Sequence, residues 1–307
     1  MTSISQSAIR NPQSLIVICG PTAVGKTALA IAVAKHFDTE IISADSRQFY
    51  KEMTICTAKP NAVELAAVKH HFINNLSIQD TYTAGMYERE ALAALKKIFA
   101  ESDVAVMVGG SGLFIKAVCE GFDSFKGEEV SEDVKEKIRS LSLEEMQQEV
   151  SKRDPEYFDR VDKQNPRRLQ RALEVIYTTG RKYSDQRTGA KAIRDFNIIK
   201  IGLELPREIL YDRINKRVDA MRKAGLWEEA TALYPLRHLQ PLQTVGYQEV
   251  FDSIEGKQSK AEAIDKIKQN SRNYAKRQMT WFKKDVEIKW FDAKDKAQIW
   301  SLFDNSR

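Results

Sequence analysis

Residues 15–37 read LIVICGPTAVGKTALAIAVAKHF, and this stretch decides the fold. Five apolar residues run directly into the glycine-rich loop Gly20–Thr27, and an alanine-rich pattern follows from Thr27 to Phe37. A short apolar run that ends at glycine is typical of a buried parallel strand. Glycines let the backbone curl so that its N–H groups point at phosphate oxygens, beside the positive end of a helix. A chance glycine turn would not explain both flanking elements, so the stretch predicts a strand, a phosphate-binding loop and a helix.

Other strands and helices alternate along the first half of the chain. Short buried strands are expected at 40–44 and 104–108, with a helix at 85–100 between them and a further strand at 198–203. This alternation predicts an α/β fold with a parallel sheet flanked by helices, as in P-loop NTPases. Ligands bind such sheets at the carboxyl ends of the strands. The polar strand ends Gly20–Thr27, Asp45–Gln48 and Gly109–Gly112 should therefore share one cleft.

The chain changes character between residues 122 and 197, where charged helical segments replace the apolar strands. Asn165-Pro166 is a typical helix start and Gly180 a typical stop, so a helix is expected over 166–179. We interpret 122–197 as a helical insertion, and 1–121 with 198–307 as the catalytic core with its C-terminal helices. Two of those helices are expected at 207–224 and 259–284, the second opening with a capping box formed by Ser259 and Glu262.

Composition sets the broad class of protein. The chain has 307 residues, a formal net charge of +5 and three cysteines without CxxC spacing, which indicate neither a disulfide framework nor a zinc site. No apolar run approaches the roughly 20 residues that cross a bilayer, and residues 1–14 lack the apolar core of a secretory signal. We expect a cytoplasmic protein that is a monomer and does not bind membranes.

Two strand ends carry candidate catalytic groups. Asp45 follows the second strand, where a carboxylate can accept a proton from a nucleophilic hydroxyl or amine, although it could instead cap the loop or support magnesium. The strand 104–108 lacks the terminal aspartate that holds Mg²⁺ in ordinary P-loop NTPases, and ends instead in a glycine-rich turn containing Ser111. The missing aspartate argues against ordinary ATP hydrolysis, and the Ser111 hydroxyl is available to a phosphate or to the nucleophile.

An arginine lies within an apolar stripe. On the helix from 207, helical spacing places Arg217 close to Leu210, in the stripe that continues through Ile214, Val218 and Met221. A buried arginine needs an anionic partner, which could be a structural carboxylate or a bound phosphate. The sequence leaves both interpretations open.

Two segments have the character of nucleic-acid-binding surfaces. The helix 166–179 places Arg167, Arg168 and Arg171 together on one face, beside Gln170. Residues 255–284 hold nine Lys/Arg against three Asp/Glu, with aromatic residues interleaved. Basic side chains contact phosphates, whereas aromatic rings and amides stack on or hydrogen-bond to unpaired bases. A solvated helix face would explain either cluster alone, whereas the two together favour an RNA substrate.

The motifs together resemble those of the tRNA dimethylallyltransferases (tRNA isopentenyltransferases), over roughly residues 14–291. In chain order they are GPTAVGKT at 20–27, Asp-Ser-x-Gln-x-Tyr at 45–50, TAKP at 57–60, GGSGL at 109–113, NPRRLQRALEV at 165–175, KRVDAMRKAGLWEE at 216–229, VGYQE at 245–249 and KRQMTWF at 276–282. Cys56 stands where the family usually has glycine, and Ser111 where it often has threonine.

The resemblance implies transfer of a dimethylallyl group from dimethylallyl diphosphate to N6 of the adenosine 3′ of the anticodon, in tRNAs that read codons beginning with U. It implies that the insertion grips the anticodon stem-loop and that the base is flipped into a channel. Asp45 would accept the N6 proton, with Ser111 hydrogen-bonding nearby, and Arg217 would hold the departing diphosphate. Mg²⁺ would be bound by Thr27.

The remaining assignments concern the two substrates. The diphosphate would lie on Gly20, Pro21, Thr22, Ala23, Val24, Gly25, Lys26 and Thr27. The tRNA would contact Asp45, Ser46, Arg47 and Gln48; Arg167, Arg168, Leu169, Gln170 and Arg171; and Gln243, Thr244, Val245, Gly246, Tyr247 and Gln248. The rival hypotheses are a P-loop kinase of a small acceptor held at Asp45, and an ATP-driven RNA-binding regulator.

Overall fold

The computed structural model describes residues 13–121, 130–187 and 189–303. The chain forms two compact units, one of Met1–Cys119 with Ile193–Arg307 and the other of Glu120–Ala192. The expected insertion, 122–197, thus ends five residues later than the second unit. Residues 193–197 belong to the first unit because they lead into its fifth strand, where Asn197 N donates to Gln13 O at 2.9 Å. Most of the N-terminal segment 1–14 lies outside the described residues.

The first unit is built on a six-stranded sheet in the order β3-β2-β4-β1-β5-β6. Its strands are β1 (Ser14–Cys19), β2 (Ile41–Ser43), β3 (His70–His71), β4 (Val104–Gly109), β5 (Asn197–Glu204) and β6 (Lys289–Asp292). Every neighbouring pair is parallel, which confirms the predicted sheet. The edge strands β3 and β6 were not predicted, because two and four residues are too short to carry a clear apolar pattern.

The central strand β1 is buried on both faces of this sheet. Leu15 and Val17 pack into one apolar core, while Ile16 and Ile18 pack into a second core on the opposite side. Successive side chains of a strand point to opposite faces. Both faces are therefore covered, and this explains why the strand is a continuous apolar run instead of an alternating one.

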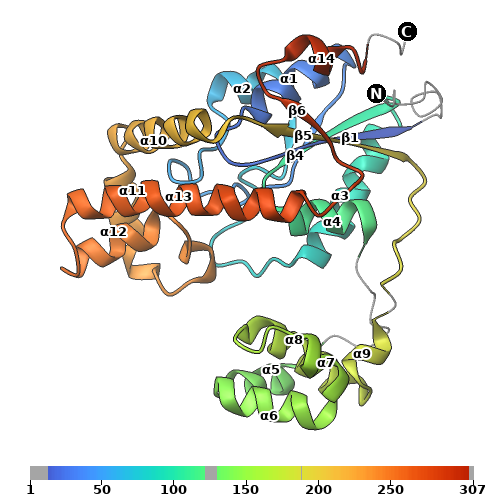
Figure 1. Ribbon diagram of the computed structural model, residues 1–307, viewed down its shortest axis with the longest axis vertical. Helices are drawn as coiled ribbons and strands as arrows, with labels where there is room; N and C mark the ends of the chain where they lie inside the picture. Colours follow the sequence, from blue (N-terminus) through green and yellow to red (C-terminus); the bar gives the residue numbers. More distant parts are fainter. Residues whose placement is uncertain (1–12, 122–129, 188, 304–307) are drawn as a thin grey trace. The chain divides into compact units, whose positions relative to one another are not determined.

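Helices surround the sheet of the first unit (Figure 1). They are α1 (Lys26–His36), α2 (Ala62–Ala67), α3 (Ala84–Ile98), α4 (Gly112–Glu120), α10 (Arg207–Lys223), α11 (Leu226–Leu233), α12 (Tyr247–Ile254), α13 (Lys260–Phe282) and α14 (Lys296–Trp300), with 3₁₀ turns at Tyr234–Leu236 and Gln240–Leu242. The predicted capping box of α13 is confirmed, since Glu262 N donates to Ser259 Oγ and Ser259 N donates to Glu262 Oε2. No described helix combines the length and apolar character needed to span a bilayer.

The second unit is a small helical bundle with its own core. It contains α5 (Glu132–Arg139), α6 (Leu143–Arg153), α7 (Pro155–Arg160), α8 (Pro166–Thr179) and α9 (Tyr183–Gln186). Helix α8 has the predicted bounds: the Asn165 side chain caps its first turn, Pro166 is its first residue, and Gly180 ends it at φ 68°. Leu169 and Leu173 of α8 pack against Met146 and Val150 of α6.

Candidate active site

The phosphate-binding loop connects β1 to α1 with backbone conformations that favour glycine. Gly20 and Gly25 have φ of 140° and 112°, and a side chain at Gly20 would lie 2.5 Å from the Leu203 carbonyl oxygen. Val24 is fully buried in the core beneath the loop. The side chain of Val24 therefore anchors the loop, and any contribution of this residue to a bound phosphate comes from its backbone.

Lys26 is folded back onto the loop. Its Nζ donates to the carbonyl oxygens of Gly20 at 3.0 Å and Pro21 at 2.7 Å. Burial lowers the pKa of Lys26 to about 8, although the nearby Asp45 carboxylate opposes the shift. An anion bound on this loop would stabilise the charged form of the amine.

Arg217 faces the same loop from α10. The apolar face of α10 is as predicted, with Leu210, Ile214 and Val218 buried. Arg217 Nη1 donates to the Thr22 hydroxyl at 3.0 Å. Among the described residues, no carboxylate forms an ion pair with Arg217, although Asp45 is near enough to raise its pKa against the lowering effect of burial. Of the two interpretations left open by the sequence, this geometry favours a site for a phosphate.

The acceptor side of the site lies at the ends of β2 and β4. Asp45 Oδ1 accepts a hydrogen bond from Arg47 N at 3.1 Å. Ser111 N donates to Ala44 O at 3.2 Å, and the Ser111 hydroxyl accepts from Ser46 N at 3.0 Å. The predicted convergence of the polar strand ends is therefore observed. Ser111 contacts the loop that carries Asp45.

Two adjoining cavities meet at these residues. The first, of about 240 Å³, has an apolar wall formed by Ile214, Val218, Met221, Leu226 and Ile267. The second, of about 270 Å³, is lined by the phosphate-binding loop, including Lys26 and Thr27. Thr22, Asp45, Arg217 and Tyr274 line both. A phosphate on the loop would thus lie next to a partly apolar chamber, with Asp45 and Arg217 between them.

The second cavity offers donors suited to magnesium. The Thr27 hydroxyl and the Asp45 carboxylate both line it. Magnesium prefers oxygen ligands, and it usually binds through one or two protein groups together with substrate phosphates and water. This donor set fits Mg²⁺.

Further residues in or beside this site were missed from the sequence, among them Tyr274, Gln278, His70 and Arg213. On α13, Tyr274 lines both cavities and Gln278 lines the second. Desolvation, together with the nearby negative charge of Asp45, raises the pKa of the Tyr274 hydroxyl to about 12. The helical spacing of these residues with Ile267 and Ser271 was the available signal, since all four lie on one face of α13.

The other two are His70 and Arg213. His70 lies in the second cavity with Nδ1 2.8 Å from Val68 O. Its buried Nε2 has no hydrogen-bond partner among the described residues. Arg213 is an exposed residue of α10 whose Nη1 donates to Val24 O at 3.2 Å and so supports the back of the loop.

The segments assigned to tRNA divide into exposed and buried residues. Arg167, Arg168 and Arg171 are exposed on α8. Leu169 and Tyr247 are fully buried, so their side chains cannot contact an RNA. Leu169 belongs to the core of the second unit, and the Tyr247 hydroxyl donates to Glu229 Oε1 at 2.6 Å.

The rest of the 243–248 segment borders the first cavity. Thr244, Val245 and Gly246 line it, whereas Gln243 and Gln248 are exposed and hydrogen-bonded to each other at 2.9 Å. Ser46 and Arg47 also line the first cavity, and Gln48 lines the second. Gln170 is half-buried on α8.

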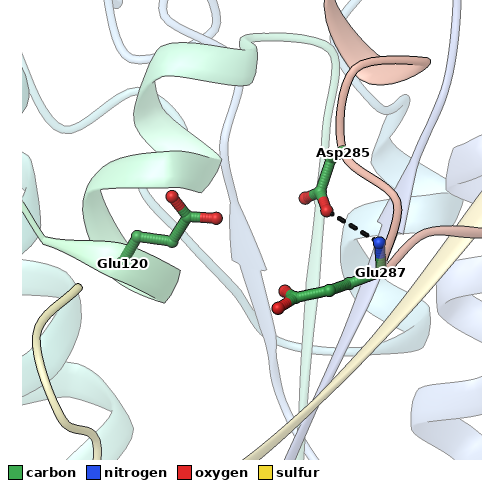
Figure 2. A group of neighbouring side chains, drawn as sticks. All are labelled: Glu120, Asp285 and Glu287. Carbon is green, nitrogen blue, oxygen red and sulfur yellow. Dashed lines mark hydrogen bonds between the residues drawn. The ribbon is translucent and has the colours of Figure 1, made fainter. Parts of the chain in front are cut away.

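A separate group of carboxylates precedes β6. Figure 2 shows Asp285 and Glu287, where Glu287 N donates to Asp285 Oδ1 at 3.0 Å. Lys200 Nζ donates to both carboxylates, at 2.7 and 2.8 Å. Burial alone would lower the pKa of Lys200. The two hydrogen bonds, with the negative charge of Asp285, together have a larger, opposite effect, so the pKa lies above the ordinary value for lysine. We interpret Asp285 and Glu287 as partners of a buried lysine.

Comparison with known proteins decides between the P-loop enzymes that could use this cleft. A family model described as IPP transferase matches residues 48–285. The chain is 50% identical to a tRNA dimethylallyltransferase of Christiangramia forsetii over 94% of its length and 96% of that protein. It is 47% identical to the enzyme of Flavobacterium johnsoniae, covering 91% and 93% of the two chains. This protein belongs to the tRNA dimethylallyltransferase family.

Solved structures support the same family assignment. The tRNA isopentenylpyrophosphate transferase of Bacillus halodurans matches with a TM-score of 0.70 and 36% identity, over 94% of each chain. A eukaryotic dimethylallyltransferase acting on tRNA matches with a TM-score of 0.81 and 27% identity, over 94% of this chain and 76% of the other. The α/β fold and the family resemblance drawn from the motifs are therefore confirmed, and a small-molecule kinase is not favoured.

Proposed function

We propose that this protein transfers the dimethylallyl group of dimethylallyl diphosphate to N6 of the adenosine 3′ of the anticodon, in tRNAs that read codons beginning with U. The observation that carries the proposal is the junction of the two cavities at Asp45 and Arg217. One cavity has the loop for a diphosphate and the other has space and apolar walls for a group that is not a phosphate. Family membership supports the choice of substrates.

The reaction requires stabilisation of a leaving group on one side of the junction and a proton acceptor on the other. A bond forms between the adenine N6 and C1 of the dimethylallyl group, the C1–O bond breaks, and the electron pair leaves with the diphosphate. Lys26, Arg217 and the loop N–H groups stabilise the charge on this leaving group. Asp45 accepts the proton that N6 loses.

Magnesium has a limited role in this proposal. Thr27, which lines the same cavity as Asp45, would hold it. When bound, the ion neutralises charge on the diphosphate. Asp45 keeps its role as the proton acceptor.

The surfaces for tRNA are proposed from exposure and charge. Arg167, Arg168 and Arg171 would contact phosphates of the anticodon stem-loop. Ser46 and Arg47, with Thr244, Val245 and Gly246, would surround the flipped base because they line the first cavity. We further propose that the protein acts in the cytoplasm and that it is a monomer. Sedimentation with and without RNA would test the monomeric state.

The decisive experiment incubates the protein and Mg²⁺ with labelled dimethylallyl diphosphate and an anticodon stem-loop RNA. The matched control RNA has guanosine in place of the target adenosine. We expect label in the first RNA and none in the control. The absence of label from both RNAs, together with ATP turnover, would contradict the proposal and support one of the rival functions.

A further inference from the structure

Gln278 of α13 is a buried amide that connects two loops of the active site. Its side chain lies between the phosphate-binding loop and the glycine-rich loop after β4, and the residue is only 6% exposed. Gln278 Oε1 accepts from Thr22 N at 2.8 Å, and Nε2 donates to Gly110 O at 2.9 Å. Because a backbone N–H only donates and a carbonyl only accepts, the orientation of the amide follows from its partners.

Each loop held by Gln278 leads to one side of the reaction. Thr22 also receives a hydrogen bond from Arg217, so it belongs to the diphosphate side. Gly110 precedes Ser111, whose hydroxyl accepts from Ser46 N next to Asp45, so it belongs to the acceptor side. One side chain therefore connects the group that would hold the departing diphosphate to the group that would hold the acceptor.

The fit around Gln278 is tight. A side chain at Gly110 would bring its Cβ to 2.3 Å from Gln278 Nε2. The glycine-rich sequence after β4 is thus explained in part by the close approach of α13. An uncharged amide also suits the position because it satisfies one donor and one acceptor without placing a negative charge beside a diphosphate.

We propose that Gln278 is a positioning residue, which sets the separation between the diphosphate on the phosphate-binding loop and the acceptor base near Asp45. This inference rests on the proposed transferase function. Small errors in the placement of two reacting groups slow the chemical step strongly. Gln278 should therefore affect kcat much more than the affinity for the diphosphate substrate.

The first test replaces Gln278 with methionine, which keeps the length of the side chain and removes both hydrogen bonds. We expect Gln278→Met to lower kcat about 100-fold, while KM for dimethylallyl diphosphate and the calorimetric affinity for magnesium pyrophosphate change less than about threefold. The matched control is Gln269→Met, at an exposed position of the same helix. It should retain the wild-type kcat, and melting curves should show that both variants fold.

The second test uses Gln278→Glu and pH. A protonated carboxylic acid can donate to Gly110 O and accept from Thr22 N, whereas the ionised form cannot donate and repels the carbonyl oxygen. The kcat of Gln278→Glu relative to wild type should rise as the pH falls from about 8 to about 5.5, while the relative kcat of Gln278→Met stays constant. Packing alone would produce no such pH dependence.

The outcomes separate this inference from the proposed function. Wild-type kcat in Gln278→Met, a change confined to KM, or a flat relative pH profile for Gln278→Glu would each overturn the positioning role. The wild-type protein would still transfer the dimethylallyl group in these cases. A folded wild type that transfers no group would instead refute the proposed function, and the positioning role with it.

Discussion

The active-site cleft and the basic face of α8 both carry positive charge, but they hold it in different ways. In the cleft, Lys26 and Arg217 are partly buried, come from different helices and hydrogen-bond to the same loop. On α8, Arg167, Arg168 and Arg171 are neighbours in sequence and exposed, and Arg171 pairs with Glu174 at 3.0 Å. Because Lys26 and Arg217 are partly buried, their charges act strongly on one ligand held in a fixed orientation. Solvent and salt screen the charges of the exposed α8 arginines.

This contrast leads to different expectations for mutation. Groups in the cleft should affect the chemical step, because they are fixed around the reacting atoms. Groups on α8 should affect RNA affinity and its dependence on salt, because they act through exposed charge. The following experiments test that division, beginning with the largest expected effect.

Replacing the proposed base should have the largest effect. Asp45→Asn keeps the shape of the side chain but cannot accept the proton, so kcat should fall by roughly 10²–10⁴-fold. Single-turnover transfer of labelled dimethylallyl groups measures this change. Asp133→Asn, which alters an exposed carboxylate on α5, serves as the control. Near-normal turnover in Asp45→Asn would show that another group accepts the proton.

Arg217 should come next, because it contacts the loop and not the acceptor. Arg217→Gln should lower kcat/KM for dimethylallyl diphosphate about 100-fold through lost stabilisation of the leaving group. Arg222→Gln on the same helix removes an exposed arginine and should change it less than about twofold. Equal effects of the two substitutions would mean that Arg217 contributes only general positive charge.

A smaller effect is expected on α8. The double variant Arg168→Glu with Arg171→Glu should weaken binding of the stem-loop RNA about tenfold and reduce the slope of log affinity against log salt by about two. The kcat at saturating RNA should remain unchanged. Filter binding between about 50 and 200 mM salt measures the slope.

The charge-matched control is Arg181→Glu with Lys182→Glu, at two exposed positions of the same unit. This control should change the slope of log affinity against log salt less than the double variant on α8 does. If both double variants change it equally, the α8 arginines act only through the net charge of the unit.

The smallest effect concerns pH. In the ligand-free protein the pKa of Lys26 is lowered to about 8 by burial. A bound diphosphate favours the charged amine and raises that pKa, so binding takes up a proton above pH 8. Affinity for magnesium pyrophosphate should be constant below about pH 8 and fall by at most about tenfold per pH unit above it. Lys26→Arg should abolish this dependence, and a slope that persists would assign it to another group.

The sequence predicted the local elements well because their signals are local. The apolar run 15–19, the glycines of the loop and the caps of α8 and α13 each specify a conformation within a few residues. Helical spacing also predicted that Arg217 lies in the apolar stripe of α10, but it did not predict the hydrogen bond to Thr22. The edge strands β3 and β6 were missed because their short runs gain stability only from their neighbours in the sheet.

What the sequence determined by itself was a P-loop α/β enzyme of a recognisable family, with Asp45, Ser111 and Arg217 as candidate groups. Only the tertiary structure decided which side chains of α10 and α13 join the polar strand ends in the cleft. Gln278 and Thr22 are 256 residues apart in sequence, yet they are hydrogen-bonded at 2.8 Å. Burial likewise removed Leu169 and Tyr247 from the RNA surface. Sequence patterns report periodicity along one element, whereas contacts and desolvation depend on which elements pack together.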